Sequence, residues 1–226
     1  MGEDDWLQYF RDNSREPSLP WGNRYRLSGA ERVAVIESIQ QFQLGENAAG
    51  KRLLQRAEAT DPEYAQALRL FVQEEQRHSA LLARFLEMEG TRCLRRHWVH
   101  GAFRWVRGWA GLELRMRVLA TAEVLAIPYY TALREATGSP LLRSICSRIL
   151  SEEAQHLRFQ AFTFARFSYG RPVLARHIAS LGHRWFLMAT TVLVWVEHER
   201  VFRAGGYSLA RVWKHSLSEG AALLLA

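Results

Sequence analysis

Two motifs with the spacing Glu-x-x-His constrain the fold of this chain more than any other feature. The first runs from Glu75 to His78, and the second runs from Glu153 to His156. On a helix, residues three apart project from one face, one turn apart, so each motif offers a carboxylate and an imidazole to a single metal ion. One such motif is typical of surface charge, but a repeated motif with matched surroundings indicates metal ligands.

Each motif follows a single glutamate at almost the same distance. From Glu46 to Glu75 is 29 residues, and from Glu123 to Glu153 is 30. A turn signal lies midway in each interval, and residues equidistant from the turn of an antiparallel hairpin lie at the same height. At ~1.5 Å of rise per residue, both sets lie roughly 21–23 Å from their turns, so we expect the side chains to meet at mid-bundle. The turns are expected at residues 59–63 and 137–140.

Four carboxylates and two imidazoles from four helices form the ligand set of a two-metal site inside a helix bundle. The predicted ligands are Glu46, Glu75, His78, Glu123, Glu153 and His156. Carboxylate with imidazole suits Fe(II) or Mn(II), whereas thiolate-rich sets favour zinc. Four ionised carboxylates balance two divalent cations, and without metal some of them would take up protons. We expect two Fe ions, with Mn or a mixed Fe/Mn pair as the alternatives.

Further polar residues lie next to the predicted ligands. Glu74 and Glu152 each precede a ligand glutamate by one residue. A ligand histidine needs an acceptor for its other ring N–H, and we expect Glu74 and Glu152 to serve the histidine of the opposite hairpin. Arg77 is expected to pair with one of these glutamates. Tyr130, seven residues after Glu123, is expected near the metals as a hydrogen-bond donor, a redox tyrosine or, in the reading we favour, a core aromatic.

Apolar residues at helical period and only six prolines indicate an all-α chain. Ser28 and Glu31 form a capping box at the start of the first long helix. We expect an irregular lead-in at residues 1–27, a bundle at 28–170 and a helical extension packed on it at 171–226. The bundle helices are predicted at residues 29–59, 62–89, 112–136 and 140–167, with Pro128 as a kink in the third.

The segment at residues 91–111 has the length of the crossover that joins two helical hairpins. It is rich in arginine, histidine and tryptophan, which is also typical of a patch that binds nucleic acid or a membrane surface. We favour a crossover that packs on the bundle with its arginine side chains reaching water.

The apolar stretch Trp185–Val196 is too short to span a membrane, which needs ~20 residues. It is expected to be a buried helix, a dimer face or a lid over an apolar substrate channel. Glu197, His198 and Glu199 follow it, but adjacent helical residues point in different directions, so we expect no metal site there. A last amphipathic helix is expected at residues 209–225.

Two features bound the surroundings of the chain. The net charge of +7 favours an acidic partner, such as a carrier protein, nucleic acid or an anionic membrane. Cys93 and Cys146 are too few for a disulfide framework, and the acidic segment Met1–Phe10 lacks the apolar core of a secretion signal. We therefore expect a reducing, cytoplasmic location.

The residues Glu74-Glu75-Gln76-Arg77-His78 resemble the Asp/Glu-Glu-x-Arg-His motif of ferritin-like di-iron carboxylate proteins. The second copy has Gln155 where that motif has Arg. The resemblance covers about residues 29–168 and implies a ferritin-like four-helix bundle, in which two antiparallel hairpins are joined by a long crossover. It also implies which ligands share a metal: Glu46, Glu75 and His78 on one side, Glu123, Glu153 and His156 on the other, with Glu75 and Glu153 as bridges.

The superfamily that the chain resembles includes oxygenases, hydroxylases, bacterioferritins, rubrerythrins and manganese catalases, and the motif does not separate them. We expect an O2-activating oxidase or monooxygenase with a small apolar organic substrate, because the long apolar C-terminal extension offers walls for a substrate pocket. An electron-donor protein would be a partner. The alternatives are a ferroxidase or iron-storage protein, a peroxide-detoxifying protein, and a metal-stabilised bundle without enzymatic activity.

Overall fold

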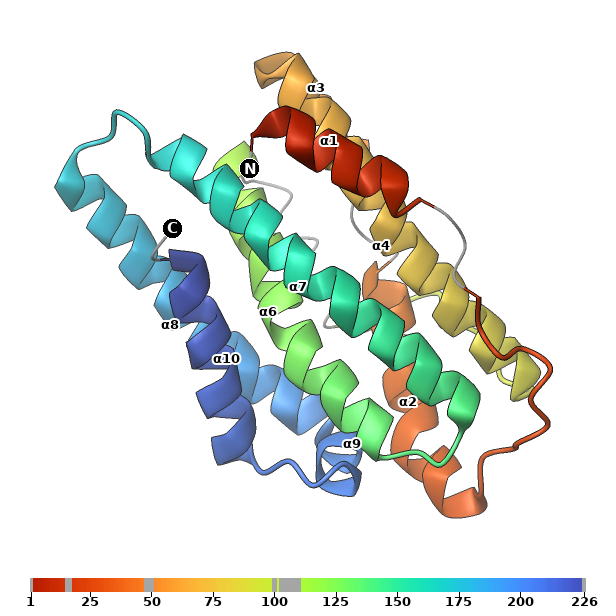
Figure 1. The fold of residues 1–226 in the computed structure, drawn as a ribbon. Coiled ribbons are helices and arrows are strands. Elements are labelled where there is room, and N and C mark those ends of the chain that lie inside the picture. Colours follow the sequence, from red (N-terminus) through yellow and green to blue (C-terminus); the bar gives the residue numbers. More distant parts are fainter. Residues whose placement is uncertain (1, 15–17, 47–50, 99–100, 102–110, 225–226) are drawn as a thin grey trace.

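A computed structural model of the chain describes residues 2–14, 18–46, 51–98, 101 and 111–224. These residues form α-helices and no strands (Figure 1), which confirms the all-α prediction. In chain order the helices are α1 (Glu3–Asp12), α2 (Gly29–Glu46), α3 (Lys51–Thr60), α4 (Pro62–Met88), α6 (Leu112–Glu135), α7 (Pro140–Ser168), α8 (Val173–Glu197), α9 (Glu199–Ala204) and α10 (Leu209–Leu224).

Side-chain caps fix the starts of the long helices. The Ser28 N–H donates to Oε2 of Glu31 at 2.8 Å, and the Glu31 N–H donates to Oγ of Ser28 at 3.3 Å, which is the predicted capping box. Asp61 accepts the backbone N–H three residues on at the start of α4, and Ser139 does the same for α7. Beyond α4, Gly90 takes a φ of +68°, a conformation that favours glycine.

The observed bounds of α4, α6 and α7 lie within two residues of those predicted. The helix predicted at residues 29–59 corresponds to α2 and α3, with residues 47–50 between them outside the described part. Most of the crossover predicted at residues 91–111 also falls outside it. The apolar stretch Trp185–Val196 belongs to a longer helix, α8, that begins at Val173.

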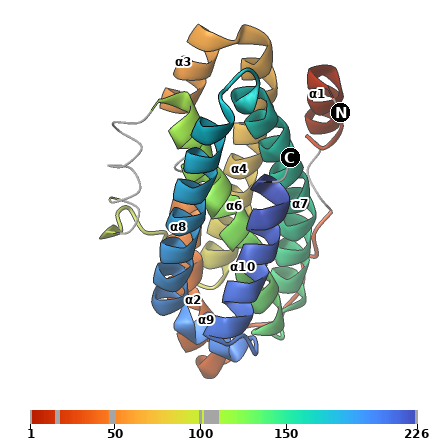
Figure 2. The same cartoon turned by 90° about the vertical axis from the view of Figure 1, so that its left-hand side faces the viewer.

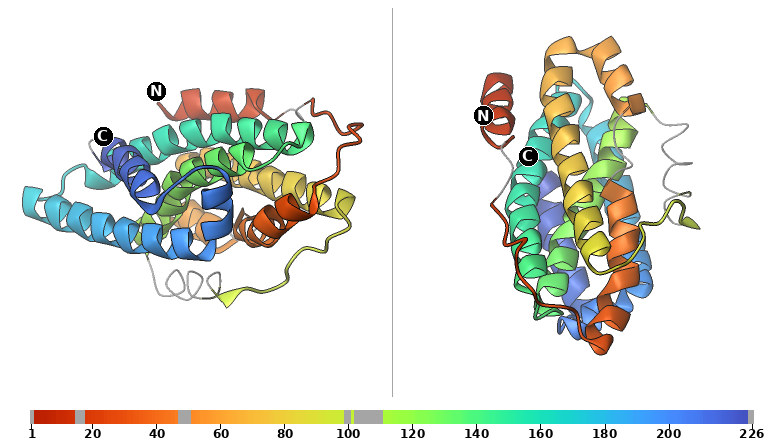
Figure 3. Two further views of the ribbon diagram at one scale, coloured as in Figure 1. Left: turned by 90° about the horizontal axis from the view of Figure 1, so that it is seen from below. Right: turned by 90° about the vertical axis from the view of Figure 1, so that its right-hand side faces the viewer.

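The helices α2, α4, α6 and α7 run lengthwise beside one another (Figures 1 and 3). Helix α2 packs on α4, α6 packs on α7, and α4 packs on α7. Apolar side chains gather in two clusters, one that includes Phe71 and Phe159 and one that includes Leu82 and Ile149. On α4 and α7 the predicted ligands fall in the interval between the two clusters, so the apolar core encloses them from both ends.

The lead-in predicted as irregular at residues 1–27 is wrong in part, because α1 occupies it. Trp6 and Phe10 are each 1 % exposed, and the ring centroid of Trp6 lies 5.4 Å from that of Phe159 on α7. Asp5 accepts the N-terminal backbone N–H of the helix at 2.7 Å. Two aromatic residues one turn apart, behind an acidic first turn, make this segment an amphipathic helix that packs on the bundle.

The C-terminal helices lie on one side of the molecule (Figure 2). Helix α10 packs against α8, α6 and α7, and α9 packs against α2 and α6. None of the described helices combines the length and the apolar character needed to cross a bilayer. The division into a bundle at residues 28–170 and a packed extension at 171–226 stays a prediction.

Gly205 follows α9 at a close approach to α6. A Cβ at this position would lie 2.3 Å from the backbone oxygen of Ala132. We expect Gly205→Ala to destabilise the fold by about 1–3 kcal/mol, because the backbone of one helix must move. Gly45→Ala in α2, where no described atom lies within 4 Å of the added Cβ, should be neutral or stabilising by up to about 1 kcal/mol. Urea unfolding measures both variants, and equal stabilities would contradict the close approach.

Stability in acid should depend on His198. Its ring is buried with Nδ1 2.8 Å from Oγ of Ser38, and burial, together with the charge of His97, lowers its pKa from 6.5 to about 3. Between these two values the unfolded chain binds a proton that the folded chain does not, so stability is present above pH ~6.5 and is lost as the pH falls. His198→Gln should reduce the slope of unfolding free energy against pH by about 1.4 kcal/mol per pH unit within that window. Urea unfolding at a series of pH values checks this slope, and the exposed His177→Gln is the control that should leave it unchanged.

Candidate metal centre

Four helices carry the six predicted ligands to one place in the interior. The residues and their helices are Glu46 at the end of α2, Glu75 and His78 on α4, Glu123 on α6, and Glu153 and His156 on α7. Apart from the partly buried Glu46, each of them is at most 3 % exposed. The three-residue spacing within α4 and within α7 turns the carboxylate and the imidazole of each motif to the same side of the helix.

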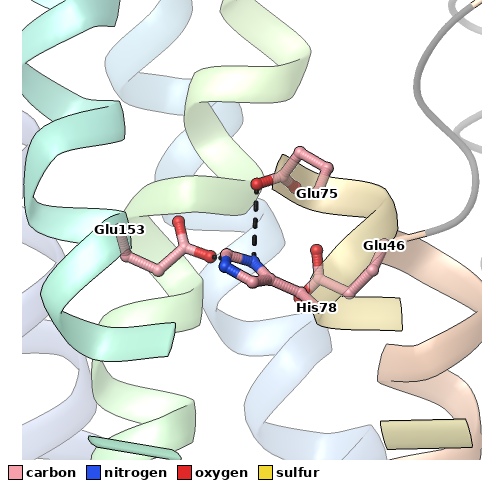
Figure 4. Close-up of side chains that lie close together, drawn as sticks. All are labelled: Glu46, Glu75, His78 and Glu153. Carbon is pink, nitrogen blue, oxygen red and sulfur yellow. Dashed lines mark ion pairs between the residues drawn. The ribbon is translucent and has the colours of Figure 1, made fainter. Parts of the chain in front are cut away.

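These side chains form two overlapping groups of donor atoms. The first group is Glu46, Glu75, His78 and Glu153 (Figure 4), and the second is Glu75, Glu123, Glu153 and His156. Within each group, one donor atom from every residue lies within 4.8 Å of the others. Each group could therefore hold a metal ion. Glu75 and Glu153 belong to both groups, so the two candidate positions share a pair of carboxylates.

The Nδ1 atom of each histidine faces these carboxylates. Nδ1 of His156 lies 3.0 Å from Oε1 of Glu75, 3.2 Å from Oε2 of Glu123 and 3.3 Å from Oε2 of Glu153. Nδ1 of His78 lies 3.6 Å from Oε1 of Glu75 and 3.4 Å from Oε1 of Glu153, and Figure 4 shows both pairs as dashed lines. The inward atom is thus the same on both rings.

Several inward atoms lack a hydrogen bond within the described part of the chain. They are Oε1 of Glu75, Nδ1 of His78 and Oε1 of Glu123, and all three are buried. A buried polar atom without a hydrogen-bond partner costs about 1–3 kcal/mol. A cation between the carboxylates and imidazoles would coordinate these atoms, so the residues present fit a bound metal.

The pKa values show how strongly these groups interact. Burial raises the pKa of Glu46 and of Glu123 well above the usual range, and the neighbouring carboxylates of Glu75 and Glu153 raise them further. Burial is the largest single influence on His78 and would lower its pKa, but the hydrogen bonds to Glu152 and Glu153 and the charges of Glu75 and Glu153 together outweigh it and raise the pKa to about 10. When no cation is bound, protons on these groups therefore supply the positive charge that balances the carboxylates.

The outer nitrogen of each histidine meets a carboxylate from the opposite hairpin. Nε2 of His78 lies 2.8 Å from Oε2 of Glu152, and Nε2 of His156 lies 3.2 Å from Oε2 of Glu74. These are the two carboxylates that the sequence analysis assigns to the histidines. Arg77 pairs with Glu74 at 3.0 Å. Each carboxylate accepts the Nε2–H of a ring, and Nδ1 is then the inward atom that could bind a metal ion.

Asn13, just after α1, joins the two outer carboxylates and was not foreseen from the sequence. Its Nδ2 donates to Oε1 of Glu152 at 2.8 Å and also to Oε1 of Glu74. Arg148 donates from Nη2 to Oδ1 of Asn13 at 2.6 Å and from Nε to Oε1 of Glu152 at 2.7 Å. Arg148 precedes Glu152 by four residues, a spacing that predicts an ion pair on a helix. No local pattern connects Asn13 to Glu74 and Glu152, which lie 61 and 139 positions away.

Tyr130 contacts a predicted ligand directly. The side chain is fully buried, and its hydroxyl donates to Oε1 of Glu46 at 2.5 Å. Burial, followed by the charge of Glu46, raises the pKa of Tyr130 well above its usual value. The hydroxyl therefore stays protonated and holds the carboxylate of Glu46 in place.

Gln160 is a second residue that the sequence analysis missed. It lies on α7 one turn beyond His156, is fully buried, and neither its Nε2 nor its Oε1 has a hydrogen-bond partner in the described part of the chain. Its position four residues after His156 was the available signal. The amide offers one donor and one acceptor to a polar group bound beside the cluster.

The sequence Glu197-His198-Glu199 does not form a metal group in the structure. The three side chains turn to different partners, as expected for neighbours on helices. These partners are His97 for Glu197 at 3.9 Å, Ser38 for His198 at 2.8 Å and Arg203 for Glu199 at 2.6 Å.

Comparison with protein-family models, with curated proteins and with solved structures found no match to this chain.

The Asn13 contacts predict a stability effect at a distance along the chain. We expect Asn13→Ala to destabilise the fold by about 1–3 kcal/mol, because buried carboxylate oxygens lose a donor. Asn23→Ala, which removes only an acceptor for the exposed backbone N–H of Tyr25, is the control and should destabilise the fold less than Asn13→Ala does. Urea unfolding compares them, and equal effects would show that Asn13 does not hold the outer carboxylates.

Proposed function

We propose that this chain is a ferritin-like dinuclear metal protein that activates O2 and oxidises an apolar organic substrate. The observation that carries the proposal is the sharing of Glu75 and Glu153 by two adjacent donor groups. Two cations with two carboxylates in common lie close enough to act together on one small molecule. The packing of α2, α4, α6 and α7 around the donors supports the ferritin-like four-helix bundle.

The donor set favours iron. Each group combines carboxylates with one imidazole, which suits Fe(II) or Mn(II) rather than zinc. The thiol of Cys146 lies in the apolar cluster with Tyr129 and Ile149 and belongs to neither group. Two Fe ions are proposed as the resident metals, and a Mn or mixed Fe/Mn pair would use the same donors.

The protein's own residues orient the donors before any metal binds. Glu152 and Glu74 fix the rings of His78 and His156 with Nδ1 inward. The hydroxyl of Tyr130 holds one oxygen of Glu46. When bound, a pair of Fe(II) ions supplies the electrons with which O2 is first reduced, and an external electron donor restores them.

Aromatic walls beside the cluster support an apolar substrate. The ring centroid of Phe71 lies 4.6 Å from the ring centroid of His156, and the ring centroid of Phe10 lies 6.3 Å from the ring centroid of His156. Both aromatic residues belong to the apolar cluster that continues away from the site. The amide of Gln160 on the same side has no hydrogen-bond partner among the described residues and would orient a polar group of an otherwise apolar molecule.

Metal analysis of protein purified without added metal tests the site. We expect about two metal ions per chain in the wild type, since two donor groups are present, and loss of most of the metal in Glu75→Ala and in His156→Ala. Circular dichroism should show that both variants keep most of their helicity. Glu58→Ala, on the exposed face of α3, is the control and should bind metal like the wild type. Unchanged metal content in both ligand variants would reject the assignment.

The reaction is tested on protein loaded anaerobically with Fe(II). Mixing with O2 should consume O2 and produce a visible absorbance change that Glu75→Ala lacks. With a reductase and a panel of apolar substrates, product formation should require reductant and O2. Continued uptake of many irons per chain as ferric mineral would instead favour the storage alternative, and no reaction with O2 would remove the enzymatic proposal.

A further inference from the structure

Helix α8 presents a long stripe of large apolar side chains to solvent. The residues are Leu174, Ile178, Leu181, Trp185, Val192 and Val196, and their exposed fractions run from 40 % to 72 %. Figure 2 and the left panel of Figure 3 place α8 at the outer side of the molecule. At ~1.5 Å of rise per residue the stripe is roughly 33 Å long. Scattered apolar residues on a surface are ordinary, but a continuous stripe of this size marks an interaction site.

The stripe points away from the protein's own core. At about 100° per residue, its six members fall within an arc of about 60° on the helix. The buried residues of α8 include His183, Leu187 and Thr190, which lie on the opposite side. The helix therefore has one face for its own bundle and a second apolar face without a described partner.

The spacing of the stripe is that of a helix that packs on another helix. The members follow one another at intervals of four, three, four, seven and four residues, and Met188 divides the interval of seven into three and four. Alternation of three and four is the heptad pattern by which two helices interlock side chains along their length. The arc of about 60° is also narrower than the apolar face of an ordinary amphipathic helix, which spans about 100° or more, and fits the seam between two helices.

Small residues flank the stripe at the same period. Ala175, Gly182 and Ala189 are spaced by seven residues and are all exposed. Gly182 lies inside the helix, where glycine weakens it, and no described atom lies within 4 Å of the position that a Cβ would take. No described residue therefore requires a glycine there, whereas the close approach of an outside helix would.

We propose that the α8 face binds the α8 face of a second copy of this chain, with the two helices antiparallel about a twofold axis near Trp185. Charge favours this direction. The charged residues within the stripe region are Arg176 and Arg184, and the first acids, Glu197 and Glu199, follow at the C-terminal end. An antiparallel pair brings these acids to the N-terminus of the partner helix, whose free N–H groups attract negative charge. A parallel pair would set Arg176 beside the partner's Arg176 and Glu197 beside the partner's Glu197.

Side-chain size also favours the antiparallel pair. With Trp185 at the axis, Leu174 faces the partner's Val196 and Ile178 faces the partner's Val192. Leu181 then faces the partner's Ala189. Large side chains of the first half thus meet small ones of the second half, as complementary packing requires.

The stripe has the composition of an interface centre. Its six large apolar side chains are 40 % to 72 % exposed, and the polar residues beside them would form the rim. Residues 173–178 are exposed on every side of the helix, so the start of α8 also gains a partner in the pair. The interface lies outside both donor groups, and the inference does not depend on the proposed function.

Sedimentation velocity on the full-length, metal-loaded and metal-free protein measures the association. We expect the wild type to sediment as a dimer at micromolar concentration in both states. Leu181→Glu with Trp185→Glu should shift it to a monomer with unchanged helicity. Gly182→Leu should weaken the dimer at least tenfold, since a bulky side chain blocks the close approach. Val33→Glu, at an exposed apolar position of α2, is the matched control and should remain dimeric.

Cross-linking tests the direction of the pair. In a Cys93→Ser background, Ile178→Cys protein mixed with Val192→Cys protein should form the mixed disulfide, and neither should cross-link efficiently with itself. Self-cross-linking of both would establish a parallel pair and overturn the proposed geometry.

Three results would overturn the proposal as a whole. The first is a wild type that stays monomeric up to 100 µM, and the second is a dimer unaffected by the α8 substitutions. The third is co-sedimentation of monomeric protein with phosphatidylglycerol vesicles that is lost in Trp185→Glu. The last result would make the stripe a membrane-binding face.

Discussion

The burial of carboxylates and imidazoles at the centre of the helices is the constraint on which the rest of the structure depends. Five of the six donor residues are almost entirely removed from water. Their donor atoms lie within 4.8 Å of one another in each group, and like charges that close repel strongly in a medium of low dielectric constant. Only matched positive charge, from protons or from cations, makes such a cluster compatible with a folded core. The apolar clusters on either side maintain this condition by excluding water.

Around this cluster the protein builds a layer that fixes orientation. Two carboxylates hold the outer nitrogens of the two rings, two arginines pair with those carboxylates, and one asparagine side chain joins both halves. These contacts orient the inner nitrogens of both rings toward the carboxylates in the absence of metal. Helix α1 contributes to this layer because it positions Asn13 beside the two carboxylates and packs on the outer side of α4 and α7.

The six inner donors could be predicted because each depends on a local rule. The spacing of Glu75 to His78 and of Glu153 to His156 is read from helical geometry, and the heights of Glu46 and Glu123 follow from distances to the turns. The bounds of α4, α6 and α7 followed from caps such as Asp61 and Ser139. These inferences need no knowledge of the tertiary structure beyond two hairpins.

The parts that could not be predicted depend on contacts between distant segments. Asn13 acquires its role only when α1 lies across the bundle, and Gln160 is noteworthy only because its amide has no partner in the described part of the chain. The helix α1 itself carried a signal in Trp6 and Phe10, but two aromatic residues are too few to outweigh the prolines and glycine that follow. The length of α8 was underestimated because its first half lacks the apolar density of its second.

The two hairpins repeat each other in ligands, spacing and outer carboxylates, yet a single amide serves both. Because Asn13 has only one side chain to share, a movement of Glu74 alters the hydrogen bond available to Glu152. The rings of His156 and His78 are thereby linked through the outside of the cluster as well as through its interior. The two halves of the cluster therefore share one hydrogen-bonding residue, and a movement of one half affects the other.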